Sequence, residues 1–213
     1  MRDRDNVANQ MINMMKRLDS MTYNHSVRVM MISAEVEEYL GMTDYQLMYA
    51  ALFHDVGKIY TPFNILDKNE RLTKLERQII DLHPYIGYSM LSEIGINEDI
   101  CRIILYHHGT HPLTIQDVGH YDKDSVYEKA LILHTIDAFE ALTSDRPYHR
   151  GVISKEALKI MTRGEKYDKR VLEYITEVSS KEEMGESAIH RMYQEERNRN
   201  DFVKDLIREM ELQ

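Results

Sequence analysis

The sequence predicts an all-α protein, and two observations support this fold class. Apolar residues recur at spacings of three and four rather than two, which is the period of an amphipathic helix. Only four prolines and nine glycines interrupt the 213 residues. We therefore expect one helical domain over residues 1–180 and a charged helical tail at 181–213, either peripheral or in contact with another subunit.

The expected helices are, in chain order, Asn6 to Leu18, Thr22 to Leu40, Tyr45 to His54, Lys74 to Leu82, Tyr85 to Ile94, Glu98 to His107 and Ser125 to Leu142, with more helix from Lys155 onward. Two segments are expected to be irregular. Thr61 to Thr73 contains Pro62 and a polar cluster, and the second runs from Gly109 to Asp124. Loops of this size in a compact domain often carry function.

Composition limits the functions open to the chain. The formal net charge of −9 argues against general nucleic-acid binding, which requires Lys and Arg to neutralise phosphates, but it allows a small phosphorylated ligand. The single cysteine, Cys101, excludes an internal disulfide and suits a reducing compartment. Because no run of about 18 apolar residues and no signal-like N-terminus is present, we expect no membrane span and a cytoplasmic location.

Two histidines occupy positions that either chemistry or packing would explain. His25 begins the stripe His25-Val29-Ile32-Val36, which places its imidazole at one end of a buried helix face. His83 precedes Pro84, where the chain is pushed away from helix and can aim a side chain across a cleft. Taken singly, a core histidine bonded to backbone explains the first and turn chemistry explains the second.

A His-Asp pair, His54-Asp55, ends an apolar helix, and Gly57 follows where a left-handed helix stop is expected. A carboxylate among apolar neighbours is costly to desolvate, so Asp55 needs a metal or a cation as its partner. An N-cap role or a salt bridge to Lys58 is the alternative interpretation.

The remaining candidates end one helix and interrupt the apolar face of another. His107 continues a buried face and His108 points around the helix end, so these two adjacent imidazoles suit a pair of metals. Asp137 lies on the stripe Ala130-Leu133-Asp137-Ala141, and an aspartate on a core face indicates a functional site because its burial is costly. Five histidines and two aspartates in such positions favour metal ligation over coincidence.

The order of these residues resembles the HD superfamily of metal-dependent phosphohydrolases, in which a lone His, a His-Asp pair and a distant Asp are metal ligands. The stretches His54-Asp55-Val56-Gly57-Lys58-Ile59 to His83-Pro84 and Asp137 to Tyr148 resemble its HD-GYP subgroup, with matches covering about Met21 to Arg150. The resemblance implies the helical bundle of the HD domain and hydrolysis of the bacterial messenger cyclic di-GMP, a small cyclic dinucleotide.

Two positions depart from the HD-GYP pattern. The Gly-Tyr-Pro tripeptide is missing, because Ile115-Gln116-Asp117 stands at its expected place. Four residues before His25, where some members carry a glutamate that binds a third metal, the chain has Met21. A two-metal centre is therefore expected.

The hypothesised centre holds two divalent transition metals bridged by Asp55, one on His25, His54 and Asp137 and the other on His83, His107 and His108. The resemblance implies iron or manganese, and nitrogen and oxygen ligands are also compatible with nickel or zinc. A hydroxide bridging the metals would attack the phosphorus in line. Beside the bridge, Lys58 would neutralise a phosphate oxygen, and the resemblance adds Arg146 as a second phosphate contact.

Two other functions stay open. The chain could hydrolyse another nucleotide or a phosphomonoester, in which case the missing Gly-Tyr-Pro tripeptide would indicate an altered substrate pocket. It could instead be a sensor that binds metal and nucleotide without turnover, although intact ligands argue against this because buried charged groups are costly to keep. Regulation by a separate partner, or by a homodimer formed through the terminal helices, is compatible with the sequence.

Overall fold

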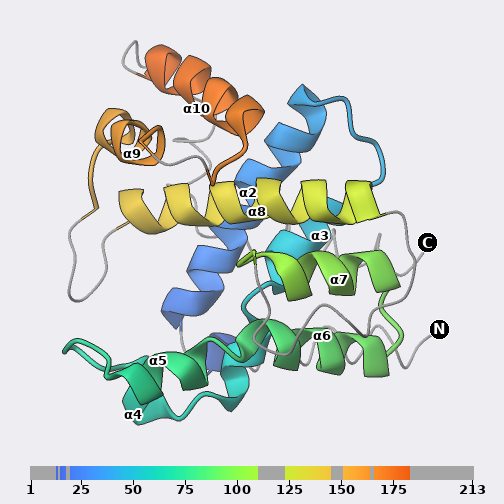
Figure 1. Cartoon of the computed structure of the whole chain (residues 1–213), viewed down its shortest axis with the longest axis vertical. Helices are drawn as coiled ribbons and strands as arrows, with labels where there is room; N and C mark the ends of the chain where they lie inside the picture. Colours follow the sequence, from blue (N-terminus) through green and yellow to red (C-terminus); the bar gives the residue numbers. More distant parts are fainter. Residues whose placement is uncertain are drawn as a thin grey trace.

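The computed structural model of the chain describes residues 13, 15–17, 20–109, 123–144, 151–163 and 166–182. Within these ranges every regular element is helical, which confirms the all-α prediction (Figure 1). The elements are α2 (Ser20–Tyr39), α3 (Gln46–Phe53), the 3-10 helix η1 (Val56–Tyr60), α4 (Phe63–Leu66), α5 (Lys74–Ile80), α6 (His83–Glu93), α7 (Glu98–Tyr106), α8 (Lys123–Thr143), α9 (Ser154–Met161) and α10 (Lys169–Glu182). Most of the first expected helix and nearly all of the expected tail lie outside the described residues.

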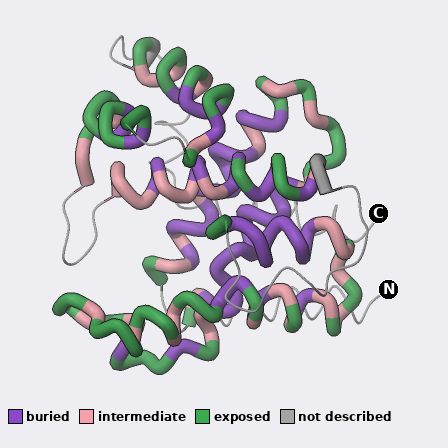
Figure 2. The backbone as a smooth tube through the Cα atoms, viewed as in Figure 1, coloured by how far each residue is buried: buried purple, intermediate pink, exposed green. Residues whose placement is uncertain are grey.

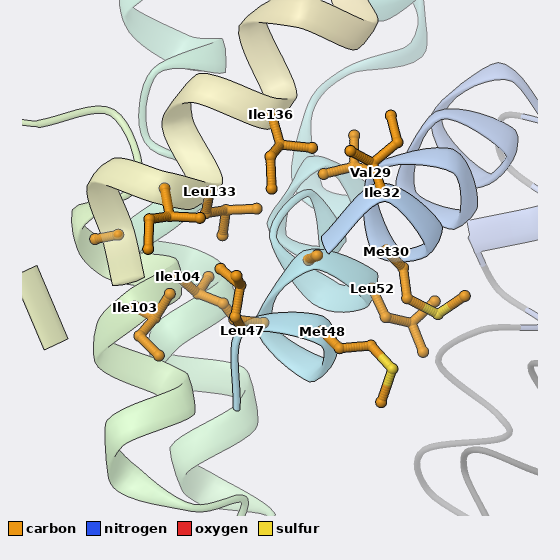
Figure 3. Close-up of a cluster of buried hydrophobic side chains, with 14 of the residues drawn as sticks. Val29, Met30, Ile32, Leu47, Met48, Leu52, Ile103, Ile104, Leu133 and Ile136 are labelled. Carbon is orange, nitrogen blue, oxygen red and sulfur yellow. The ribbon is translucent and has the colours of Figure 1, made fainter. Parts of the chain in front are cut away.

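The core lies where α2, α3, α7 and α8 meet. α2 packs against α3 and α8, and α7 contacts both α3 and α8. Figure 3 shows side chains from these helices converging, among them Val29, Leu47, Ile103, Leu133 and Ile136, all fully buried. A side chain of this size contributes about 1.5–3 kcal/mol when it leaves water. The helices that carry most of the candidate ligands are therefore held together by the most deeply buried part of the molecule.

The outer elements are arranged around this core. α6 packs on α7 and η1, while α9 and α10 pack on α8. Figure 2 shows that α4 and α5, by contrast, are mostly exposed, and Figure 1 shows them projecting beside the N-terminal end of α2. Among the described residues, no helix combines the length and the apolar character needed to cross a membrane.

Two local predictions about the chain near the His-Asp pair are wrong. Gly57 does not stop a helix in a left-handed conformation, since the described glycines with positive φ are Gly41, Gly95 and Gly109. It lies inside η1, where a Cβ would stand 2.1 Å from the His83 carbonyl oxygen and 2.8 Å from the Gly87 nitrogen. The requirement at this position is therefore close approach of two backbones, not a special dihedral angle.

His83 also differs from its predicted setting, because it is the first residue of α6 rather than part of an extended turn. Pro84 stands next to it in the first helical turn, where its missing N–H group has no intrahelical acceptor to lose. The segment predicted as irregular from Thr61 to Thr73 likewise contains a one-turn helix, α4.

A buried acidic side chain near the end of α2 ties this helix to α3. Glu37 is 1% exposed, and its Oε1 accepts a hydrogen bond from the Leu47 backbone N–H at 2.9 Å. Its Oε2 has no hydrogen-bond partner among the described residues. Nearby, Lys129 Nζ pairs with Asp44 Oδ2 at 2.5 Å and with Gln46 Oε1 at 2.8 Å. Burial raises the pKa of Glu37 to about 7, and the charge of Asp44 adds to this effect.

This raised pKa predicts how stability changes with pH. The neutral carboxyl stabilises the fold fully below the ordinary pKa of 4.5, and this contribution is lost as pH rises through about 7. Glu37→Gln keeps the acceptor for Leu47 and stays neutral, so its Tm should exceed that of the wild type increasingly between pH 5 and 8. Thermal melts by circular dichroism in EDTA measure the difference. Glu38→Gln, which removes an exposed charge from the same helix, is the control, and a parallel pH response in both variants would contradict the prediction.

Candidate metal centre

The structure brings the seven candidate ligands together where the ends of several helices meet. His25 comes from α2 and Asp137 from α8, while the other five stand at the ends of α3 and α7 and at the start of α6. Their ligand atoms form three overlapping groups, each within 4.8 Å: His83, His107 and His108; His25, His54 and Asp55; His54, His107 and Asp137. Residues far apart in sequence thus form one continuous cluster.

Backbone hydrogen bonds set the orientation of three imidazoles. Nδ1 of His54, His83 and His107 each donates to the carbonyl three residues earlier, at 2.7, 2.7 and 2.6 Å. A carbonyl only accepts, so Nδ1 carries the proton and Nε2 is left with a lone pair. Among the described residues, Nε2 of His83 and of His107 is buried without a hydrogen-bond partner. Such nitrogens are costly to bury unless a cation binds them, so they fit a metal.

The protonation of these groups also suits metal binding. Burial lowers the pKa of His83 to about 3, and although Asp55 opposes this effect, the nearby Lys58 and His108 add to it. Burial likewise lowers the pKa of His107 well below its ordinary value, with neighbouring imidazoles contributing. Both rings are therefore neutral near pH 7, which is the state in which histidine donates electrons to a metal.

Asp55 lies between the two sides of the cluster. Its side chain is 2% exposed; Oδ2 is 3.5 Å from His54 Nε2 and 3.7 Å from His25 Nε2, whereas Oδ1 is 3.2 Å from His83 Nε2. Oδ2 also accepts from Lys58 Nζ at 2.6 Å, so the salt bridge considered as an alternative is present as well. Burial raises the pKa of Asp55, but Lys58 and the imidazoles outweigh it and hold the pKa well below its usual range.

The last two candidate ligands differ in exposure. Asp137 is half-buried, with Oδ1 3.0 Å from His25 Nε2 and 3.9 Å from His54 Nε2. His108 is exposed, yet its ring centroid is 3.9 Å from that of His107 and 5.1 Å from that of His83. These contacts agree with the prediction that His107 continues a buried face and His108 turns around the helix end.

Glu140, which the sequence analysis did not single out, supports the centre from behind. Its side chain is buried, Oε2 accepts from His25 Nδ1, and Oε1 accepts from Arg28 Nε and from Ser144 Oγ, the latter at 2.5 Å. Burial lowers the pKa of His25, but hydrogen bonds with Asp137 and Glu140 outweigh it and raise the pKa to about 9. A carboxylate behind a ligating histidine orients the ring and strengthens its donor nitrogen. The available sequence signal was the spacing of Asp137 and Glu140 on one helix face.

A cavity of about 720 Å³ opens beside the cluster. His25, Asp55 and Lys58 line its inner end, and it continues along α4, α5 and the segment between them. Ser144 also lines it, immediately before residues 145–150; Arg146, the second predicted phosphate contact, therefore lies outside the described residues, as does the altered loop at 110–122.

Comparison with known proteins identifies the family. Residues 22–142 match the model of the HD domain. The chain belongs to the HD-domain family. This assignment confirms the resemblance drawn from the order of ligands, and the all-α fold agrees with it.

Individual relatives act on cyclic dinucleotides, according to their names. A cyclic di-GMP phosphodiesterase of Borreliella burgdorferi is 27% identical over 71% of the HD-domain chain and 41% of its own length. A 3′3′-cGAMP-specific phosphodiesterase of Vibrio cholerae is 29% identical over 66% of the chain and 31% of its own length. The chain thus spans less than half of each relative. The solved structure of Bd1817, described as an HDG"Y"P protein from Bdellovibrio bacteriovorus, has the same fold, with a TM-score of 0.55 and 21% identity over 73% of the chain and 51% of that structure.

The close approach of η1 and α6 at Gly57 predicts that any larger side chain there disturbs the candidate metal centre. Gly57→Ala should lower Tm and reduce bound metal, because a Cβ at 2.1 Å from the His83 carbonyl must push η1, with Asp55 and Lys58, away from α6. Thermal melts and metal analysis of the purified variant measure both effects. Gly87→Ala, whose Cβ would meet Val56 at 3.3 Å, is the milder control. Normal metal content in Gly57→Ala would show that close packing here does not position the ligands.

The hydrogen bond between Glu140 and His25 predicts that Glu140 affects metal affinity without contacting the metal itself. Glu140→Ala should weaken Mn²⁺ binding about 10- to 100-fold, because His25 loses the carboxylate that orients it. Glu140→Gln keeps an acceptor oxygen and should lose less. Calorimetric titration of the metal-free protein measures both. Glu128→Gln, an exposed change on the same helix, should bind as the wild type does, and equal affinities in all four proteins would refute the supporting role.

Proposed function

We propose that the chain is a metal-dependent phosphodiesterase that hydrolyses cyclic di-GMP. The observation that carries the proposal is the position of Asp55, whose Oδ2 faces the imidazoles of His25 and His54 while its Oδ1 faces that of His83. A carboxylate in such a position is the expected bridging ligand of a two-metal phosphohydrolase. The names of the relatives support the substrate class.

The proposed centre has two divalent transition metals, with iron or manganese favoured and nickel or zinc compatible with the donor atoms. One is assigned to His25, His54 and Asp137, the other to His83, His107 and His108, and Asp55 is shared. Bound there, the metals would supply Lewis acidity and a water of lowered pKa for attack on phosphorus. Met21, which lines the cavity one helical turn before His25, offers no carboxylate for a third metal.

The chain's own residues have distinct proposed roles. Asp55 holds the two halves of the centre together and is kept ionised chiefly by the Lys58 ammonium group beside it. Lys58 is half-buried, lines the cavity and lies within 2.6 Å of Asp55, so its ammonium group is in position to neutralise a phosphate oxygen beside the centre. Arg146 is proposed as a second phosphate contact on the basis of the family resemblance.

The size of the cavity is compatible with this substrate class, because small-molecule sites in proteins measure about 300–1,000 Å³. A second cyclic dinucleotide, 3′3′-cGAMP, is the alternative substrate, favoured by the Vibrio cholerae relative. Cytoplasmic location, a homodimer and the charged tail as a separate element remain predictions from the sequence.

The proposal predicts the effect of removing the bridge. Asp55→Ala should lose at least one of two metal equivalents and lower cyclic di-GMP turnover by more than 100-fold, since both metals lose a shared ligand. Mass spectrometry of bound metals and chromatographic assay of the linear product measure the two effects. Asp81→Ala, an exposed change at the end of α5, is the control. Two retained metals with full turnover in Asp55→Ala would refute the assigned bridge.

A further inference from the structure

The outer end of the cavity has a chemistry unlike that of its inner end. At the inner end, the charged groups are already engaged: Lys58 pairs with Asp55, and Arg28 pairs with Glu140. At the outer end, the cavity is lined by a segment we call the α4–α5 arm, residues 63–80. The arm supplies an aromatic ring and several charged groups to the same space that reaches the metal ligands.

Phe63 is the aromatic group of the arm. Its side chain is 65% exposed although it lines the cavity, and it stands at the first position of α4. Because this phenyl ring is exposed, it contributes little hydrophobic free energy to the fold. A nucleobase stacking on such a ring would remove apolar surface from water on both partners, and stacking of this kind tolerates any base.

Four charged groups that line the outer end, two arginines and two carboxylates, have no partner among the described residues, whereas Lys68 is paired with Glu76. Arg71 and Arg77 line the cavity, and neither guanidinium has an ion-pair or hydrogen-bond partner within the described ranges. The carboxylates of Asp67 and Glu70 also line it and are also without such partners there. Two guanidiniums and two carboxylates that line one space together carry no net charge, so they do not form a simple anion site. They offer donors and acceptors together, which a purine edge requires.

The arm is held in shape before any ligand arrives. Lys68 Nζ donates to both carboxylate oxygens of Glu76 at 2.8 Å, which joins the loop to α5. Thr73 and Glu76 form a capping box, with bonds of 3.3 and 2.7 Å between side chain and backbone. A loop ordered in this way loses less conformational freedom on binding, which favours recognition by defined contacts.

We propose that the α4–α5 arm is a nucleobase site that selects guanine, an inference that rests on the proposed phosphodiesterase function. Phe63 stacks on the base, and a guanidinium of Arg71 or Arg77 donates to guanine O6 and N7. The carboxylate of Asp67 or Glu70 accepts from the ring N1–H and from the N2 amino group of guanine. Adenine presents an amino group in place of O6, so it meets the arginine donors with a donor and binds more weakly.

The test compares the manganese-loaded full chain with three variants, Phe63→Ala, Arg71→Ala and Arg77→Ala, on cyclic di-GMP and cyclic di-AMP. The wild type is expected to prefer cyclic di-GMP in KM. Phe63→Ala should raise KM for both dinucleotides roughly 5- to 150-fold, since stacking is tolerant of the base. Whichever of Arg71→Ala and Arg77→Ala removes the contacting guanidinium should raise KM for cyclic di-GMP by a similar factor and change KM for cyclic di-AMP little, so at least one of the two variants loses the preference for guanine.

Matched controls separate a base site from general damage. Leu75→Ala removes another exposed apolar side chain of the arm that does not line the cavity, and Arg163→Ala removes an exposed arginine elsewhere; both should leave KM unchanged. Unchanged KM values in all three test variants would overturn the proposal. So would an equal rise for both dinucleotides in the arginine variants, or a change confined to kcat.

Failure of the proposed function has a different signature. Bis(p-nitrophenyl) phosphate is a phosphodiester without bases, so its hydrolysis by the wild type reports on the metal centre independently of any base site. If the wild type hydrolyses this substrate but calorimetry detects no binding of cyclic di-GMP, the base site is overturned while the phosphodiesterase activity stands. Calorimetric binding of cyclic di-GMP in preference to cyclic di-AMP, lost in Arg71→Ala or Arg77→Ala, would support the base site even if no phosphodiester is hydrolysed.

Discussion

The burial of the Asp55 carboxylate at the meeting point of several helix ends is the constraint on which the rest of the site depends. A nearly inaccessible negative charge must be balanced, and the structure surrounds it with imidazole nitrogens and one ammonium group. To supply these groups, α3 ends and α6 begins at this place. Gly57 is required for the same reason, because it lets η1 and α6 approach until their backbones touch.

The ends of helices also explain why the imidazoles are ready to bind metal. At the last turn of a helix the carbonyl groups lack intrahelical partners, and a histidine placed three residues later can donate to one of them. The same bond satisfies the carbonyl, determines which ring nitrogen carries the proton and directs the other toward the cluster. Secondary structure and ligand chemistry are therefore coupled through a single short contact.

Much of this arrangement could be predicted from the sequence, because it follows from local spacing. The stripe that places His25 on a buried face and the aspartate at position 137 on another are one-dimensional patterns, and the helices that carry them are found where expected. The contact of Glu140 with His25 and Arg28 was not predictable in this way, since it joins α8 to α2. Gly57 was predicted as a helix stop, whereas it is required for close approach, because a close approach between two backbones leaves no local sequence signal distinct from a helix stop.

The exposure of the candidate ligands differs between the two halves of the proposed centre. His108 alone among the seven is exposed, whereas His25, His54 and Asp55 are all buried. A cation held partly by an exposed imidazole can leave by the release of one side chain, while a cation among His25, His54 and Asp55 must be released by several buried groups at the wall of the cavity. The two metals would then exchange with the medium at unequal rates, so the pair bound in the cell and the pair recovered after purification would differ first on the His108 side.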